Sequence, residues 1–123
     1  MKILLVDDSK TMRNIQKKCL GEVATEIAEA GDGVEALAEI NNEVGKFGLI
    51  MIDWNMPNMN GFQLVQEIRK FDKSTPLIMC TTEAEKARVV EAIKAGVNNY
   101  VIKPFTPDSM MEKVNATLAK IAA

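Results

Sequence analysis

Four short apolar runs each end at a chemically active residue, and this pattern constrains the fold more than any other feature of the chain. The runs are residues 3–6, 49–52, 76–80 and 100–102, and the residues that follow them are Asp7-Asp8, Asp53, Thr81 and Lys103. Unbroken apolar runs are typical of parallel strands that are buried on both faces. In open parallel sheets the ligand site lies outside the carboxyl ends of the strands. The sequence therefore predicts that acids, a hydroxyl and an ammonium converge at one edge of a sheet.

The segments between these runs carry helix signals, and a weaker strand is expected over residues 23–30. Capping residues and capping-box patterns predict helices after Ser9, from Asp32, after Gly61, from Thr82 and from Thr106. The apolar stripes expected to face the sheet include Met12, Ile15, Cys19 and Leu20 in the first helix and Val34, Leu37 and Ala38 in the second. This alternation predicts five βα units in one α/β layer sandwich.

The fourth expected helix can present two apolar faces. Val90, Ile93 and Val97 fall on one stripe, which we expect to pack against the sheet. Val89 lies about 100° around the helix from Val90, so we expect it to be a partly exposed anchor for a partner segment bearing acids. A stripe broad enough to bury Val89 is the alternative. The basic residues expected on the rim of this anchor are Lys86 and Lys113.

Composition and charge exclude several classes of function. A formal charge of -2 gives no electrostatic case for binding nucleic acid or a membrane surface. No apolar run is long enough to span a membrane, and the first run is too short for a signal peptide. The absence of histidine removes His-based catalysis and His metal ligands. Cys19 and Cys80 are expected to be buried thiols in a reducing cytoplasm.

The three carboxylates of Asp7, Asp8 and Asp53 would repel one another in one cleft, and a hard cation such as Mg²⁺ would relieve that repulsion. The charge of Lys103 and the hydroxyl of Thr81 would complete a site for the oxygens of a transferring phosphoryl group. Asp53 is then the expected nucleophile, because a carboxylate can form an aspartyl phosphate. Taken singly, these residues have simpler interpretations as helix caps or surface charges; their convergence at the ends of four strands favours a site.

The same residues resemble the receiver domain of two-component response regulators. The motifs that carry the resemblance are Val6-Asp7-Asp8-Ser9, residues 53–61, Thr81 and Lys103-Pro104-Phe105. The resemblance covers nearly the whole chain and is strongest to the stand-alone chemotaxis regulators of that family. It implies a flavodoxin-like three-layer sandwich around a doubly wound, five-stranded parallel sheet in the order 2-1-3-4-5. It also implies that residues 1–123 form a single receiver domain without an effector domain.

The resemblance assigns metal ligands residue by residue. Asp8 and Asp53 would bind Mg²⁺ directly, Asn55 would contribute its backbone carbonyl, and Asp7 would act mainly through water. Asp53 would be the phosphoacceptor, modified from the phosphohistidine of a histidine kinase. No turnover of external substrates is expected.

The resemblance also implies how the site would switch the protein. Lys103 would contact the phosphoryl group, Thr81 would swing toward it, and Tyr100 would follow inward. The bond between Lys103 and Pro104 would be cis. The output surface would comprise the fourth helix, the fifth strand and the fifth helix.

We expect a cytoplasmic monomer whose partners are a chemotaxis-type histidine kinase, the flagellar motor switch protein and a phosphatase. A phosphorelay shuttle or a regulator of another target is the alternative within the family. Outside the family, a phosphohydrolase of the haloacid dehalogenase type would need an acid-base residue where Asn55 stands. A flavodoxin-like electron carrier would place a flavin phosphate beside Asp7 and Asp8, which would repel it.

Overall fold

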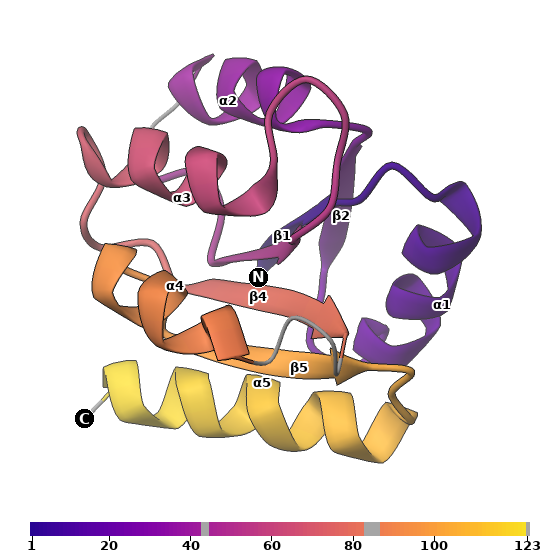
Figure 1. Ribbon diagram of the computed structural model, residues 1–123. Coiled ribbons are helices and arrows are strands. Elements are labelled where there is room, and N and C mark those ends of the chain that lie inside the picture. Colours follow the sequence, from indigo (N-terminus) through magenta and orange to yellow (C-terminus); the bar gives the residue numbers. More distant parts are fainter. Residues whose placement is uncertain (43–44, 83–86, 123) are drawn as a thin grey trace.

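Five parallel strands form one sheet with helices on both of its faces in the computed structural model of the protein (Figure 1). The structure describes residues 1–42, 45–82 and 87–122. The strands are β1 Lys2–Val6, β2 Glu26–Ala30, β3 Leu49–Asp53, β4 Leu77–Thr82 and β5 Asn99–Lys103. The helices are α1 Lys10–Leu20, α2 Gly33–Asn42, α3 Gly61–Arg69, α4 Val89–Ala95 and α5 Pro107–Ala122. The strand order β2-β1-β3-β4-β5 confirms the predicted flavodoxin-like topology.

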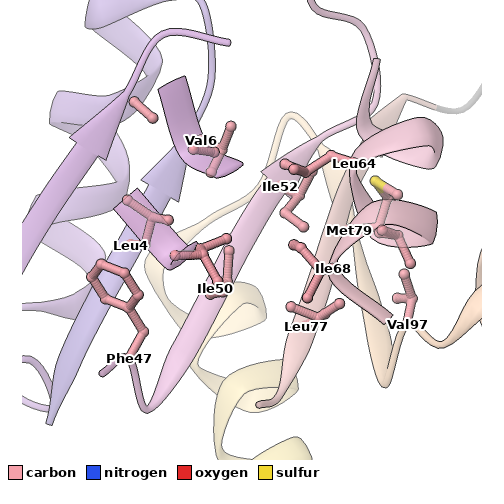
Figure 2. Close-up of a cluster of buried hydrophobic side chains, with 14 of the residues drawn as sticks. Leu4, Val6, Phe47, Ile50, Ile52, Leu64, Ile68, Leu77, Met79 and Val97 are labelled. Atoms are coloured by element: carbon pink, nitrogen blue, oxygen red, sulfur yellow. The ribbon is translucent and has the colours of Figure 1, made fainter. Parts of the chain in front are cut away.

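Two hydrophobic clusters lie on opposite faces of this sheet. Leu4 and Val6 point into the cluster covered by α2, α3 and α4, which Figure 2 shows. Ile3 and Leu5 point into the other cluster, which α1 and α5 cover. Because successive strand residues face opposite sides, a strand buried on both faces must be apolar at every position. This is the physical reason for the unbroken apolar runs in the sequence.

Four of the predicted helix starts are found, whereas α4 begins at Val89 and not at Thr82, which is the last residue of β4. The side chain of Ser9 accepts a hydrogen bond from the backbone amide of Met12, as an N-cap of α1. Asn60 and Gln63 exchange the two hydrogen bonds of a capping box at the start of α3. Of the capping box expected over residues 82–85, residues 83–85 lie outside the described residues. Among the described residues, no helix combines the length and apolar character needed to cross a membrane.

The predicted orientation of α4 is wrong. Val89 is 7% exposed and packs inward, whereas Val90 is 60% exposed and Ile93 is 50% exposed. Val97 is buried as expected and lies in the cluster of Figure 2. The apolar residues that α4 presents to solvent are therefore Val90 and Ile93, and Val89 is not a surface anchor. Of the two basic residues expected beside it, Lys86 lies outside the described residues, and Lys113 lies over the ring of Tyr100.

The end of α4 explains this error. Gly96 adopts a φ of 123° and terminates the helix, so the burial of Val97 belongs to the following turn and says nothing about the helix face. Within the helix, Ala92 is the residue that joins Val89 in the interior. A side chain at position 96 would be strained by its positive φ and would meet Arg69 at 2.7 Å.

Two other apolar stripes are partly confirmed, because Cys19, Leu20 and Leu37 pack against the core as expected. In α1, Ile15 is exposed, whereas Gln16 is buried beside the sheet. In α2, Val34 is exposed, and the buried positions are Ala36 and Ile40. In both helices a small or polar residue, Gln16 or Ala36, occupies an inward position, so apolar spacing alone misplaced Ile15 and Val34.

Candidate functional site

Asp7 is buried directly after β1, and its polar atoms all have partners within the chain. Its amide donates to the carbonyl of Ala30 at 3.1 Å, and its own carbonyl accepts a hydrogen bond from Nη1 of Arg13. Its carboxylate accepts from the amide of Ser9 at 2.9 Å and from Nζ of Lys103 at 3.2 Å. These contacts fix both the backbone and the side chain of Asp7.

Asp53 is the last residue of β3, and the loop that follows it folds back against it. The amide of Trp54 donates to the carbonyl of Cys80 on β4, and the amide of Gly61 donates to the carbonyl of Trp54. A Cβ at position 61 would lie 2.3 Å from the carbonyl oxygen of Asp53, so this close approach requires glycine. Asp53 is thereby held nearly buried, whereas Asp8 is exposed beside it.

Lys103, at the end of β5, reaches across β4 to these acids. Its Nζ lies 2.6 Å from Oδ1 of Asp53 and 3.2 Å from Oδ2 of Asp7. The peptide bond between Lys103 and Pro104 is cis. One ammonium therefore joins the ends of β1, β3 and β5, which lie far apart in the sequence.

The surroundings of the site raise the pKa values of both Lys103 and Asp53. Burial raises the pKa of Asp53 to about 6, and the charges of Asp7 and Asp8 add to the rise, against the hydrogen bond and charge of Lys103. Burial alone would lower the pKa of Lys103, but its hydrogen bond to Asp53 and the nearby carboxylates outweigh burial and raise it. At neutral pH Lys103 is an ammonium and Asp53 is mostly ionised.

Three carboxylates of the site meet closely enough to share a cation. One oxygen from each of Asp7, Asp8 and Asp53 lies within 4.8 Å of the others. An all-oxygen set with several negative charges fits Mg²⁺ better than a softer metal. Asn55 lies exposed in the loop after β3, two residues beyond Asp53. The structure thus brings the three acids together as the sequence predicted.

Thr81 and Tyr100 lie on the two strands next to this cluster. Thr81 is fully buried near the end of β4, and its hydroxyl donates to the carbonyl of Thr82 at 3.3 Å. Tyr100 lies partly buried on β5, and Nζ of Lys113 sits 4.6 Å from the centre of its ring.

Sequence reasoning missed an ion-pair network behind Asp7. Nε of Arg13 donates to Glu29 at 2.9 Å, and Nζ of Lys17 lies 2.7 Å from the other oxygen of that carboxylate. Arg13 and Lys17 are four residues apart on one helix face, which is visible in the sequence. Their link to Glu29 was not, because it depends on the register that pairs Leu5 with Glu29.

The two cysteines are buried free thiols, as predicted. Burial raises the pKa of Cys80 to about 12, so this thiol is protonated at neutral pH. Nε2 of the buried Gln16 approaches its sulfur at 3.5 Å.

Comparisons with known proteins agree with the fold. The family described as the response regulator receiver domain matches residues 3–115. Chemotaxis protein CheY1 of Helicobacter pylori is 49% identical over 121 residues, which cover 96% of this chain and 97% of that protein. The chemotaxis protein CheY homolog of Campylobacter jejuni is 48% identical over 123 residues, which cover 96% of this chain and 92% of that protein. The solved structure of CheY4 from Vibrio cholerae superimposes with a TM-score of 0.81 at 34% identity, covering 94% of this chain and 97% of that one.

The chain belongs to the receiver domain family of response regulators. Within that family it is similar over nearly its full length to the chemotaxis proteins of the CheY type.

Proposed function

We propose that this protein is a chemotaxis response regulator that accepts a phosphoryl group on Asp53 from a histidine kinase in a magnesium-dependent reaction. The observation that carries the proposal is the grouping of the Asp7, Asp8 and Asp53 carboxylates, two of which, Asp7 and Asp53, also contact the ammonium of Lys103. The positive charge of Lys103 can offset part of the negative charge of a phosphoryl group added to Asp53. Full-length similarity to chemotaxis proteins supports the choice of pathway.

The reaction is a transfer between two nucleophiles. An ionised oxygen of Asp53 attacks the phosphorus of the kinase phosphohistidine, and an acyl phosphate bond forms. The phosphorus–nitrogen bond breaks, and its electron pair leaves with the imidazole nitrogen. A small acyl phosphate such as acetyl phosphate would serve as donor in the same way, with its carboxylate as leaving group. Water later cleaves the acyl phosphate, and no turnover of external substrates is expected.

The metal would be held by Asp8, Asp53 and the backbone carbonyl of Asn55, with Asp7 acting mainly through water. The close approach of three carboxylate oxygens fits a hard divalent cation. When bound, Mg²⁺ would offset the negative charge of the incoming phosphoryl oxygens. Lys103 supplies the positive charge on the other side of Asp53, and its contact with Asp7 keeps it in the site.

The switch would run from Asp53 through Thr81 to Tyr100. The hydroxyl of Thr81 makes a long 3.3 Å hydrogen bond to a backbone carbonyl, and a phosphoryl oxygen is a stronger acceptor. Movement of Thr81 toward it would vacate space beside β5, into which Tyr100 can turn. Lys113 stacks on the Tyr100 ring in the present structure, so α5 would respond to that turn.

The output surface would be the face formed by α4, β5 and α5. Val90 and Ile93 are exposed apolar residues on α4, and Ile121 is exposed on α5. A groove of about 520 Å³ runs between these helices. Its lining residues are Ile93, Val97, Asn98, Asn99, Ala116, Thr117, Lys120 and Ile121. We propose the flagellar motor switch protein as the target; a phosphorelay shuttle or a regulator of another target is the second candidate.

Phosphorylation is tested by incubating the protein with acetyl phosphate and Mg²⁺ and mapping the adduct by mass spectrometry after borohydride trapping. The expected result is reduction of one residue, Asp53, to homoserine, with no such product in Asp53→Asn or when Mg²⁺ is chelated before acetyl phosphate is added. Glu26→Gln, at the opposite end of the sheet, is the matched control and should be modified like the wild type. A homoserine at full yield elsewhere in Asp53→Asn would show that another residue is the acceptor.

The target is tested separately by pull-down with phosphorylated and unphosphorylated protein. Selective capture of the purified motor switch protein by the phosphorylated form would support the flagellar output. Equal capture by both forms would exclude it, and phosphoryl transfer onward to a histidine protein would favour the phosphorelay.

A further inference from the structure

We infer that Arg13 is a positioning residue for the metal-binding loop, and that Glu29 holds its guanidinium in place. Arg13 acts through the backbone of Asp7 and does not touch the metal. The inference rests on the proposed Mg²⁺ site and gives a role to two residues that are not among its proposed metal ligands.

The guanidinium of Arg13 bridges two elements that the chain separates. Nη1 donates to the carbonyl of Asp7, and Nε donates to Oε1 of Glu29 at 2.9 Å. The planar fork of an arginine can make both contacts at once, which a single-headed lysine cannot. The Arg13 side chain is 16% exposed, and its contact with the Asp7 carbonyl is partly buried. α1, the end of β1 and β2 are thereby tied together immediately behind the acids.

The contact fixes the peptide that leads into Asp8. The amide of Asp7 is bound to the carbonyl of Ala30, and the carbonyl of Asp7 is bound to Arg13. Because a peptide unit is planar, fixing that carbonyl also sets the direction in which the chain enters Asp8. Asp8 is exposed, so the peptide behind it is what keeps its carboxylate near those of Asp7 and Asp53.

The charge of Arg13 is held away from the metal ligands. Arg13 contacts the backbone oxygen of Asp7, and its side-chain partner is Glu29. Lys17 binds the second oxygen of Glu29 at 2.7 Å, and its hydrogen bond, against the effect of burial, lowers the pKa of Glu29. Glu29 is therefore an anchored carboxylate that keeps Arg13 from swinging to Asp7 or Asp8 and competing with a cation.

Positioning and simple electrostatics predict opposite effects for the loss of Arg13. A cation near the site repels Mg²⁺, so removing it should tighten metal binding if charge alone mattered. If Arg13 positions the loop, removing it should weaken metal binding despite the loss of positive charge. Lys17→Ala is the matched control, since it removes the same charge from the same carboxylate without a contact to Asp7.

The experiment titrates Mg²⁺ into metal-free wild type, Arg13→Ala and Lys17→Ala. The readout is the fluorescence of Trp54, the single tryptophan, which is buried next to Asp53. We expect the dissociation constant of Arg13→Ala to rise by about ten-fold, as is usual when a group supporting a metal ligand is lost. That of Lys17→Ala should stay within about two-fold of wild type, because its exposed charge is screened. Unchanged or tighter binding in Arg13→Ala would overturn the inference.

Two further readouts separate positioning from a general loss of structure. In metal-free protein, amide exchange at Ser9, which donates to the Asp7 carboxylate, should quicken in Arg13→Ala and not in Lys17→Ala. At low Mg²⁺, acetyl phosphate should phosphorylate Arg13→Ala more slowly than wild type. At saturating Mg²⁺ the two rates should be equal. A rate that stays low at saturation would contradict a role in metal positioning. If Arg13→Ala does not fold, Arg13→Lys carries the test: weaker Mg²⁺ binding supports the inference, and wild-type binding overturns it.

Asp8→Ala distinguishes this inference from the proposed function. Loss of Mg²⁺ binding in Asp8→Ala with unchanged binding in Arg13→Ala would reject only the role of Arg13. Unchanged binding in Asp8→Ala would reject the proposed metal site itself.

Discussion

The ammonium of Lys103 donates a 2.6 Å hydrogen bond to Oδ1 of Asp53, and the two residues are fifty positions apart in the chain. A phosphoryl group on Asp53 would draw on the same ammonium, so Lys103 would have to redirect its hydrogen bond. Lys103 is the last residue of β5, so phosphorylation of Asp53 would change a contact of the strand that also contains Tyr100. Lys103 therefore connects the phosphorylation site to the proposed output surface.

Lys103→Ala should permit phosphorylation of Asp53 but uncouple it from partner binding. The metal can still offset part of the phosphoryl charge, whereas the link to β5 is lost. Partner affinity is measured by titration with and without a stable phosphoryl analogue, with Lys73→Ala, an exposed lysine in the α3–β4 connection, as control. A wild-type gain in affinity on phosphorylation of Lys103→Ala would remove Lys103 from the switch.

Asp53→Asn should change the pH dependence of stability in a defined direction. The pKa of Asp53 is raised from 3.8 to about 6 in the folded state, so the native protein binds this proton more tightly than the unfolded chain. Stability due to this group is therefore present at low pH and falls as pH rises from about 4 to about 6. The loss amounts to at most about 3 kcal/mol, at 1.4 kcal/mol for each pKa unit.

The test is urea unfolding of wild type and Asp53→Asn with a chelator, over the range of about pH 4 to pH 8. Asp53→Asn has no carboxyl group to titrate at this position. Its unfolding free energy, relative to that of wild type, should therefore rise as pH increases from about 4 to about 6. A difference that is constant with pH would show that Asp53 titrates normally.

Asp8→Ala should weaken Mg²⁺ binding and, without metal, raise the melting temperature. Asp8 is an exposed member of the acid group, and its charge contributes to the raised pKa of Asp53. Removing it deletes an oxygen ligand and relieves repulsion between carboxylates. We expect the dissociation constant to rise by at least about ten-fold, or about 1.4 kcal/mol. Glu26→Ala is the control, and equal Mg²⁺ affinity in both variants would contradict the assigned ligand.

The sheet and the acid cluster could be predicted because both follow from strand burial. A strand covered on both faces must be apolar throughout, so the end of each run marks the edge of the sheet where Asp7, Asp53 and Lys103 meet. The parallel topology then brings those ends together without any further information. Strand burial could not predict which side chains pair between a helix and a strand, as Arg13 of α1 and Glu29 of β2 do.

Helix orientation was less predictable because small and polar residues can occupy inward positions. Gln16 faces the sheet in α1, where its amide has a sulfur partner on β4, and Ile15 is left exposed. In α4 the interior position is taken by Ala92, which apolar periodicity weighs lightly. Short helices such as α4 offer too few turns for the period to correct one misleading residue.

The corrected orientation of α4 leads to a paired test of the output surface. Val90 is 60% exposed, so Val90→Asp should leave the melting temperature nearly unchanged and phosphorylation of Asp53 intact. If Val90 is buried by the partner, its loss should weaken binding by about 1–2 kcal/mol, or about five- to thirty-fold. Val89 is 7% exposed, so Val89→Asp would place an unpaired charge in the interior and should lower the melting temperature markedly. Thermal melting and titration of the phosphorylated variants with the captured target measure both effects. A stable Val89→Asp would contradict the burial of Val89, and wild-type target affinity in Val90→Asp would move the output surface away from the exposed face of α4.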